Sequence, residues 1–292
     1  MKENPLLRAT DNRLFLFCDI DGTMTPYGGP QGSPEAYPAF RRLASRLEVV
    51  LAYVTGRSPA EARELIRKFD LPVPDYLASD VGSTIERRKD SDFELMQNWW
   101  DTIARDWNGV TTQQIQECLE GIPGLRLQEE SYQNRCKVSY YTDFNVASNV
   151  LVNRVQATLL KLRIRSQVLW SSDDHRMVGY LDVMPLGAGK LGAVKWLLSQ
   201  TGISSENAIY AGDASNDLSV LASGLRSVMP RNGHEQVRKD ALALLEKKER
   251  GLSGRLYIAK GGFLGFDGHV LGGVLEGIFM HFPHTREWML EA

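Results

Sequence analysis

Short apolar runs and segments of helical periodicity alternate along most of the chain. The apolar runs predict buried strands near residues 14–18, 49–54, 207–211 and 228–230, and residues 77–85 predict a further strand with a glycine turn. Helical patterns lie between them, near residues 35–47, after the capping box that begins at Ser58, from Lys190 to a stop at Gly202, and at 218–222. Strands that are apolar on both faces and alternate with helices are typical of a parallel sheet covered on both sides. The pattern therefore predicts an α/β protein.

A second α/β pattern interrupts this alternation after the third apolar strand. Residues 86–92 are strongly charged, and beyond them the pattern predicts helices near 99–107, 111–119 and 151–162 and strands near 137–141, 166–171 and 177–184. We therefore expect three segments: 1–86 as the first part of a core domain, 87–183 as an inserted α/β domain, and 184–292 as the second part of the core. The last of these should contain a strand near 255–258 and a glycine-rich amphipathic stretch up to His281.

The aromatic helix near 99–107 allows two interpretations. Trp99, Trp100 and Trp107 could stack on a sugar ring, but the spacing between Trp100 and Trp107 is helical. That spacing favours packing in a core.

Composition narrows the class of protein. The chain has 292 residues, of which 43% are hydrophobic and 24% charged, as in ordinary globular proteins. Its net charge of −2 gives no overall field that would attract nucleic acid or an anionic membrane. Three cysteines at no metal-ligand spacing indicate a reducing compartment, so we expect a cytoplasmic location. Residues 1–13 have no apolar signal core and are expected to form a loose leader, and the apolar stretch at 263–282 is too interrupted for a membrane helix.

Acidic residues follow two of the predicted strands. Asp19 and Asp21 end the first strand and, being two residues apart, share one face of it. Asp213 and Asp217 follow the strand at 207–211. The carboxyl edge of a parallel sheet is where ligands bind, and oxygen ligands without nearby His or Cys favour Mg²⁺. The alternative for the first pair is a polar turn with two solvated acids, and for Asp217 an acid that caps the following helix.

A hydroxyl and a lysine complete the set of candidate residues. Thr55 and Gly56 stand between a strand end and a helix start, where backbone amides can hold a phosphate oxygen. Lys190 begins a helix and suits a transferring phosphoryl group, although it could equally be a solvated helix residue. Arg57 could bind the same anion or be solvated. Acids, a hydroxyl, a lysine and Mg²⁺ together favour phosphoryl transfer.

Four motifs in chain order resemble those of the haloacid dehalogenase (HAD) superfamily. They are Asp-x-Asp-Gly-Thr from Asp19, Thr-Gly-Arg from Thr55, Gly-x-Gly-Lys from Gly187 and Gly-Asp-x-x-Asn-Asp from Gly212. The resemblance implies a Rossmann-like HAD core and an inserted α/β cap domain. It also implies that Asp19 is a nucleophile that forms an aspartyl-phosphate and that Asp21 is the general acid/base. Phosphate would bind to Thr55, Gly56, Lys190 and Asn216, and Mg²⁺ to Asp19, Asp21 (through its backbone carbonyl), Asp213 and Asp217.

The inserted segment is most similar to the cap of sucrose-phosphate phosphatases. The similarity is carried by residues 127–133, 137–143 and 181–190. It implies hydrolysis of sucrose 6-phosphate, with the cap selecting a small-molecule sugar phosphate and an association with a sugar-phosphate synthase as a further possibility. Gln133 and Lys137 could hydrogen-bond the sugar, or they could be polar residues of a half-buried sheet.

Three other functions stay open at this point. The substrate could be another glycosyl phosphate, such as mannosylfructose phosphate or trehalose 6-phosphate. The enzyme could be a sugar phosphomutase, because both reactions need an acid/base. A protein of a different class would be an inactive phosphosugar-binding module, but a module of that kind would have no need of the nucleophile.

Overall fold

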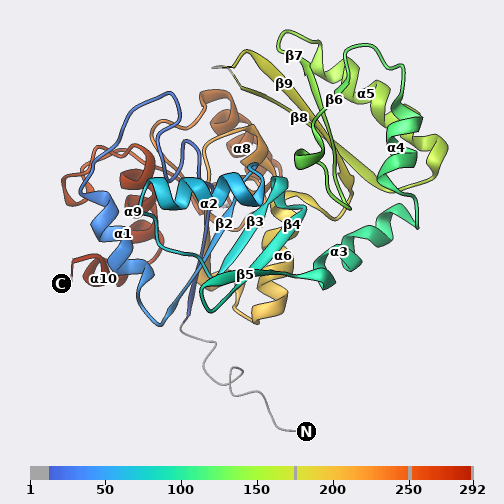
Figure 1. Ribbon diagram of the computed structural model, residues 1–292. Helices are drawn as coiled ribbons and strands as arrows, with labels where there is room; N and C mark the ends of the chain where they lie inside the picture. The colour runs from blue at the N-terminus through green and yellow to red at the C-terminus, as the bar shows by residue number, and fades with distance from the viewer. Residues whose placement is uncertain (1–12, 174–175, 249–251, 291–292) are drawn as a thin grey trace, which may run out of the picture.

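The apolar strands predicted from the sequence lie side by side in the computed structural model, which describes residues 13–173, 176–248 and 252–290. Within these residues, eight strands form one sheet in the order β12-β11-β10-β1-β2-β3-β4-β5 (Figure 1). Strands β12 to β3 are parallel, and β4 and β5 are antiparallel. The bounds are β1 Leu14–Cys18, β2 Val49–Val54, β3 Tyr76–Ser79, β4 Thr84–Lys89, β5 Asp92–Leu95, β10 Ala208–Ala211, β11 Arg226–Met229 and β12 Leu256–Ile258.

Strand β1 lies at the point where the order of the sheet reverses. Phe15 is in register with Val50 of β2 on one side and with Ala208 of β10 on the other. The chain therefore leaves β1 in one direction and returns much later on its opposite side. In open α/β sheets, ligands bind beside the carboxyl ends of strands at such a point. The topology thus puts the residues that follow Cys18 where a ligand is expected.

Helices cover both faces of this sheet. Successive strand residues point to opposite faces, so each strand contributes side chains to a core on either side. Leu16 and Cys18 pack in one core with helices α1, α2, α9 and α10. Phe15 and Phe17 pack in a second core with α3, α6, α7 and α8. The bounds are α1 Ala36–Ala44, α2 Pro59–Lys68, α3 Gln97–Ile103, α6 Gly189–Thr201, α7 Leu218–Leu221, α8 Glu235–Lys248, α9 Val270–His281 and α10 Thr285–Leu290.

A smaller antiparallel sheet lies beyond the carboxyl edge of the large one (Figure 1). Its order is β6-β7-β9-β8, and α4 and α5 pack on it through a third hydrophobic core. The bounds are β6 Arg126–Leu127, β7 Val138–Asp143, β8 Ser166–Asp173, β9 Val178–Pro185, α4 Thr112–Leu119 and α5 Ser148–Leu159. The large sheet continues past residue 87 through β5, so an inserted domain that begins after Leu95 fits the two sheets better. The division into domains stays a proposal.

The tryptophans and the ends of the chain allow three further comparisons with the sequence predictions. Trp99 and Trp107 are each 2% exposed, which confirms that they pack in cores. The predicted leader lies outside the described residues except for Arg13. Among the helices of the described ranges, none is both long enough and apolar enough to span a bilayer.

The glycine-rich tail is part of the core domain. Its predicted strand is β12, and its amphipathic stretch is α9, which packs against β11. Close packing depends on Gly277, where a Cβ atom would lie 2.1 Å from Val228 Cγ2. The buried carboxylate of Glu276 accepts hydrogen bonds from the Tyr257 hydroxyl (2.7 Å) and from the N–H groups of Lys260 (2.9 Å) and Gly261 (2.8 Å). These bonds fix the loop between β12 and α9.

His281, at the end of α9, is expected to make stability depend on pH. Burial lowers the pKa of its ring below the ordinary value of 6.5, and Nε2 lies 3.2 Å from the Ser227 carbonyl oxygen. The unfolded chain therefore takes up a proton near pH 6.5 that the folded ring resists, so the free energy of unfolding should fall as pH drops below that value. Urea unfolding between pH 5.5 and 7.5 should show a smaller loss in His281→Gln than in the wild type. Equal losses would contradict the prediction.

Candidate active site

The carboxyl ends of β1, β2 and β10 and the start of α6 meet at one edge of the large sheet. They carry Asp19, Thr55, Asp213 and Lys190, which line a cleft of about 1140 Å³. Residues of the smaller sheet, among them Leu169 of β8, line the opposite wall. The residues that the sequence predicted from separate strand ends are therefore brought together in one cavity.

Lys190 joins two carboxylates at the bottom of this cleft. Its Nζ lies 2.9 Å from Asp19 Oδ1 and 2.7 Å from Asp217 Oδ1, and its side chain is 0% exposed. Burial raises the pKa of the Asp19 carboxyl, and the Lys190 ammonium opposes this shift. Lys190 is thus no solvated helix residue: its charge compensates acids that have little access to water.

Asp217 shapes the loop that follows β10. Its Oδ1 accepts the bond from Lys190 and another from the Tyr210 hydroxyl. Its Oδ2 accepts the N–H groups of Asp213 and Ala214, both at 3.0 Å. Both oxygens are therefore engaged, so the geometry favours Asp217 as a residue that orients its neighbours over one that binds a metal directly.

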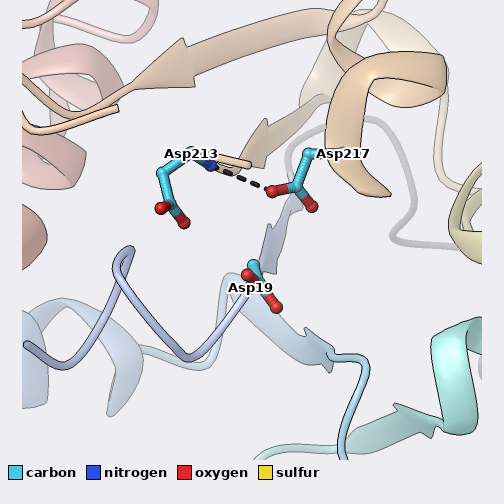
Figure 2. A group of neighbouring side chains, drawn as sticks. All are labelled: Asp19, Asp213 and Asp217. Carbon is cyan, nitrogen blue, oxygen red and sulfur yellow. Dashed lines mark hydrogen bonds between the residues drawn. The ribbon is translucent and has the colours of Figure 1, made fainter. Parts of the chain in front are cut away.

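Asp213 and Asp19 lie near each other, beyond the carboxyl ends of the paired strands β10 and β1 (Figure 2). Its Oδ1 accepts a hydrogen bond from Thr23 Oγ1 at 2.6 Å, and burial together with the Asp217 charge raises its pKa to about 7. Gly22 has φ +75°, and a Cβ there would lie 2.3 Å from Asp213 Oδ2. Only glycine therefore leaves room for this carboxylate beside the turn.

The tail reaches the same turn through Asn232. Asn232 Nδ2 donates to the carbonyl of Gly22 at 2.6 Å, and Asn232 Oδ1 accepts the N–H of Val270 at 2.7 Å. The turn that follows Asp21 is thus tied to the start of α9. The sequence did not indicate Asn232, because a single asparagine after β11 carries no periodic signal.

The three acids fit a hard divalent cation. Asp19, Asp213 and Asp217 each offer a carboxylate oxygen, and these oxygens lie within 4.8 Å of one another. Oxygen ligands of this kind suit Mg²⁺. Because both oxygens of Asp217 already accept hydrogen bonds, Asp19 and Asp213 are the carboxylates best placed to hold the ion.

Asp21 is held by Arg57, which the sequence left open as solvated or anion-binding. Arg57 Nε donates to Asp21 Oδ2 at 2.8 Å, and Nη2 donates to Oδ1 at 2.9 Å. A fork of this kind fixes the plane of a carboxylate. Arg57 is therefore a site residue whose role the sequence did not determine.

The predicted phosphate-binding residues lie along the cleft beside Asp19. Thr55 is 1% exposed, and its Oγ1 accepts the N–H of Arg57 at 3.2 Å. Gly56 and Asn216 are neighbours, since a Cβ on Gly56 would lie 3.4 Å from Asn216 Nδ2. Asn216 Oδ1 is buried and has no hydrogen-bond partner among the described residues. All three residues line the cleft.

The two predicted sugar-binding residues have different surroundings. Lys137 lines the cleft, and its buried Nζ lies 3.6 Å from Asp80 Oδ1 and 3.9 Å from Asp182 Oδ1. Gln133 is not among the described residues that line the cleft: its amide bonds the carbonyls of Gln128 and Ser139 and the N–H of Ser139. For Gln133 these bonds favour the alternative of a polar residue in the sheet, and its sugar contact stays a prediction.

The sequence matches the family model of sucrose-6F-phosphate phosphohydrolase over residues 12–282. The chain belongs to this family. The match covers the core, the inserted segment and most of the tail. It identifies the protein as a phosphoric monoester hydrolase of the HAD superfamily and confirms the family, the fold class and the class of enzyme predicted from the motifs.

Relatives within and around the sucrose-6F-phosphate phosphohydrolase family cover most of the chain. A HAD-like hydrolase of Nitrosococcus oceani is 38% identical over 95% of this chain and 74% of its own length. The mannosylfructose-phosphate phosphatase of Agrobacterium fabrum is 29% identical over 69% of this chain and 76% of its own length. The X-ray structure of the sucrose-phosphatase from Synechocystis sp., in complex with sucrose and phosphate, matches with a TM-score of 0.72 at 25% identity. That match covers 92% of this chain and 98% of the other.

Aromatic side chains of the inserted segment also line the cleft of this sucrose-6F-phosphate phosphohydrolase family member, although the sequence did not indicate them as site residues. They are Tyr132, Tyr141, Trp170 and Tyr180. Tyr141 and Tyr180 contact each other with ring centroids 6.0 Å apart. The strand predicted near 137–141 includes Tyr141, but a strand pattern alone does not show which of its two faces lines a cleft.

Proposed function

We propose that this protein is a Mg²⁺-dependent phosphatase that hydrolyses sucrose 6-phosphate to sucrose and phosphate through an aspartyl-phosphate on Asp19. The observation that carries the proposal is the pairing of the buried Asp19 with Lys190, opposite Asp213 and beneath a cleft with polar and aromatic walls. The similarity to a sucrose-phosphatase whose structure holds sucrose and phosphate supports the choice of sugar.

The chemistry divides into two steps. In the first, an Asp19 oxygen forms a bond to phosphorus, the bond from phosphorus to the sugar oxygen breaks, and Asp21 gives its proton to that oxygen. In the second, water attacks phosphorus, the Asp19 carboxylate leaves, and Asp21 takes a proton from the water. Phosphate and the free alcohol are the products, and both acids return to their starting forms.

Charge at the site favours the transfer. In this proposal Lys190, Thr55 and Gly56, which line the cleft, bind the phosphoryl oxygens, whose charge spreads in the transition state. Mg²⁺ held by Asp19, Asp213 and the Asp21 carbonyl would neutralise phosphoryl charge and offset the crowding of the three acids.

The cleft has room for a sugar as well as for a phosphoryl group. Its volume of about 1140 Å³ far exceeds that of a phosphoryl group. Aromatic rings and polar side chains together are suited to the apolar faces and the hydroxyls of a sugar. The mannosylfructose-phosphate phosphatase among the relatives makes mannosylfructose phosphate the strongest rival substrate.

The test is phosphate release from sugar phosphates assayed side by side with Mg²⁺. Sucrose 6-phosphate, mannosylfructose phosphate, trehalose 6-phosphate and glucose 6-phosphate are compared, with an EDTA control. We expect sucrose 6-phosphate to be preferred and EDTA to abolish release. Preference for another sugar would overturn the substrate, and full activity in EDTA would overturn the metal requirement.

The cysteines bear on the cellular location of the protein. All three cysteines, which lie in the described part of the chain, are free, and this supports a cytoplasmic location. The association with a sugar-phosphate synthase stays a prediction.

A further inference from the structure

Arg57 connects the candidate general acid to the inserted segment. Its guanidinium holds both oxygens of Asp21, at 2.8 and 2.9 Å, while Nη1 lies 3.8 Å from Glu61 Oε1. Its Cζ lies 5.7 Å from the centroid of the Tyr27 ring. Arg57 therefore has a carboxylate on each side and an aromatic ring against it.

Two of these neighbours of Arg57, Tyr27 and Glu61, are hydrogen-bonded to residues of the inserted segment. The Tyr27 hydroxyl donates to Asp173 Oδ2, at the end of β8, at 2.5 Å. The Tyr132 hydroxyl donates to Glu61 Oε1 at 3.3 Å. Tyr132 and Asp173 belong to the inserted segment, whereas Tyr27 and Glu61 belong to the core. Two contacts between the inserted segment and the core thus involve direct neighbours of Arg57.

We propose that Arg57 is the positioning residue for Asp21 and that the contacts of Tyr27 and Glu61 with the inserted segment set its place. The proposal rests on the proposed role of Asp21 as general acid/base. It assigns Arg57 no contact with the reacting atoms, because Arg57 acts through Asp21.

The geometry allows this role. Each carboxylate oxygen has two lone pairs, so a fork that uses one on each oxygen leaves the others for the leaving group or for water. The fork fixes the plane of the carboxylate and so determines where a proton can be delivered. When Asp21 gives its proton to the sugar oxygen, it becomes an anion beside the Arg57 cation, which stabilises that charge.

The effect of an Arg57 substitution on substrates with different leaving groups tells whether Arg57 positions Asp21 or only stabilises the fold. A sugar alkoxide is a poor leaving group and needs a proton, whereas p-nitrophenolate leaves without one. Protonation by a positioned acid contributes about 10²–10⁴-fold where it is needed. Arg57→Gln should therefore lower kcat for sucrose 6-phosphate by about 10²-fold and change kcat for p-nitrophenyl phosphate less than about threefold. Equal losses on both substrates would overturn the proposal, as would unchanged activity on the sugar phosphate.

A double-mutant cycle tests whether the effect passes through Asp21. Asp21→Asn should show the same dependence on the leaving group, and adding Arg57→Gln to it should cost nothing more. If the fold-losses in kcat of the two single variants multiply in the double variant, Arg57 acts independently of Asp21, and the proposal would be overturned. If Asp21→Asn itself lacks the dependence on the leaving group, it is the proposed role of Asp21 that fails. If the wild type prefers another sugar phosphate, the comparison is made on that substrate and the test of Arg57 is unaffected.

Tyr27→Phe tests the link to the inserted segment. The variant keeps the ring against Arg57 and loses only the hydroxyl that bonds Asp173. We expect kcat for sucrose 6-phosphate to fall several-fold with p-nitrophenyl phosphate unaffected, and we expect no further loss when Arg57→Gln is already present. A loss that is the same on both substrates, or that persists in the Arg57→Gln background, would overturn the link.

Discussion

Replacing Asp19 with asparagine is expected to lower turnover by at least about 10⁴-fold, because removal of a covalent nucleophile leaves only the contribution of binding and charge. An amide has nearly the same shape as the carboxylate but does not attack phosphorus. The fold should tolerate the change, since burial already raises the pKa of Asp19 and so disfavours its charged form. Phosphate release with Mg²⁺ measures the loss, and calorimetry of sugar-phosphate binding should show that binding survives.

Asp92→Asn is a matched control for this variant. Asp92 is exposed on β5, away from the cleft, and its replacement should leave turnover unchanged. Melting temperatures of both variants near that of the wild type would exclude misfolding. Turnover of Asp19→Asn above about one-hundredth of the wild-type value would contradict its role as nucleophile.

Lys190→Met is expected to impair both stability and turnover. The side chain is fully buried and lies within 3 Å of two carboxylates, at 2.9 Å from Asp19 and 2.7 Å from Asp217. Removing one partner of a buried ionic cluster leaves charge uncompensated and costs about 3–5 kcal/mol. Loss of a positive charge at a transferring phosphoryl group should also lower kcat by about 10²–10³-fold. Urea unfolding at pH 7 and phosphate release measure the two effects.

A second substitution separates the effects of Lys190→Met. Adding Asp217→Asn removes one of the unpaired acids, so part of the lost stability should return, because replacing both partners of a buried pair is often close to neutral. Turnover should not return with it. Lys190→Met as stable as the wild type would show that the ammonium does not compensate these acids.

Much of the site could be predicted because it lies at the ends of regular elements. A strand that is apolar on both faces places its last residues at the edge of a parallel sheet, which is why Asp19, Thr55 and Asp213 could be assigned to one cleft from three separate runs. The capping box at Ser58 likewise located the start of α2, and the structure has this box.

The remaining contacts depend on distances that no local pattern records. Arg57 is three residues beyond the end of β2, where the local sequence is the same whether the arginine is solvated or paired with a carboxylate. Asn232 meets Gly22 across 210 positions of the chain. Gln133 was a candidate because it is polar, whereas its hydrogen bonds to the backbone of the small sheet depend on the tertiary register. The charged run at 86–92 suggested a boundary at residue 87, whereas β4 and β5 continue the large sheet to Leu95, a pairing that a local charge pattern does not record.

The most direct test of the account is to trap the phosphorylated enzyme during turnover. The protein is mixed with Mg²⁺ and sucrose 6-phosphate that carries a radiolabelled phosphoryl group, quenched in acid within milliseconds, and digested for peptide mapping. We expect label on the peptide that contains Asp19. Hydroxylamine should remove it, as expected for an acyl phosphate, and it should be absent in Asp19→Asn. Release of phosphate with no label on the protein at any time, or label on another residue, would contradict an aspartyl-phosphate on Asp19.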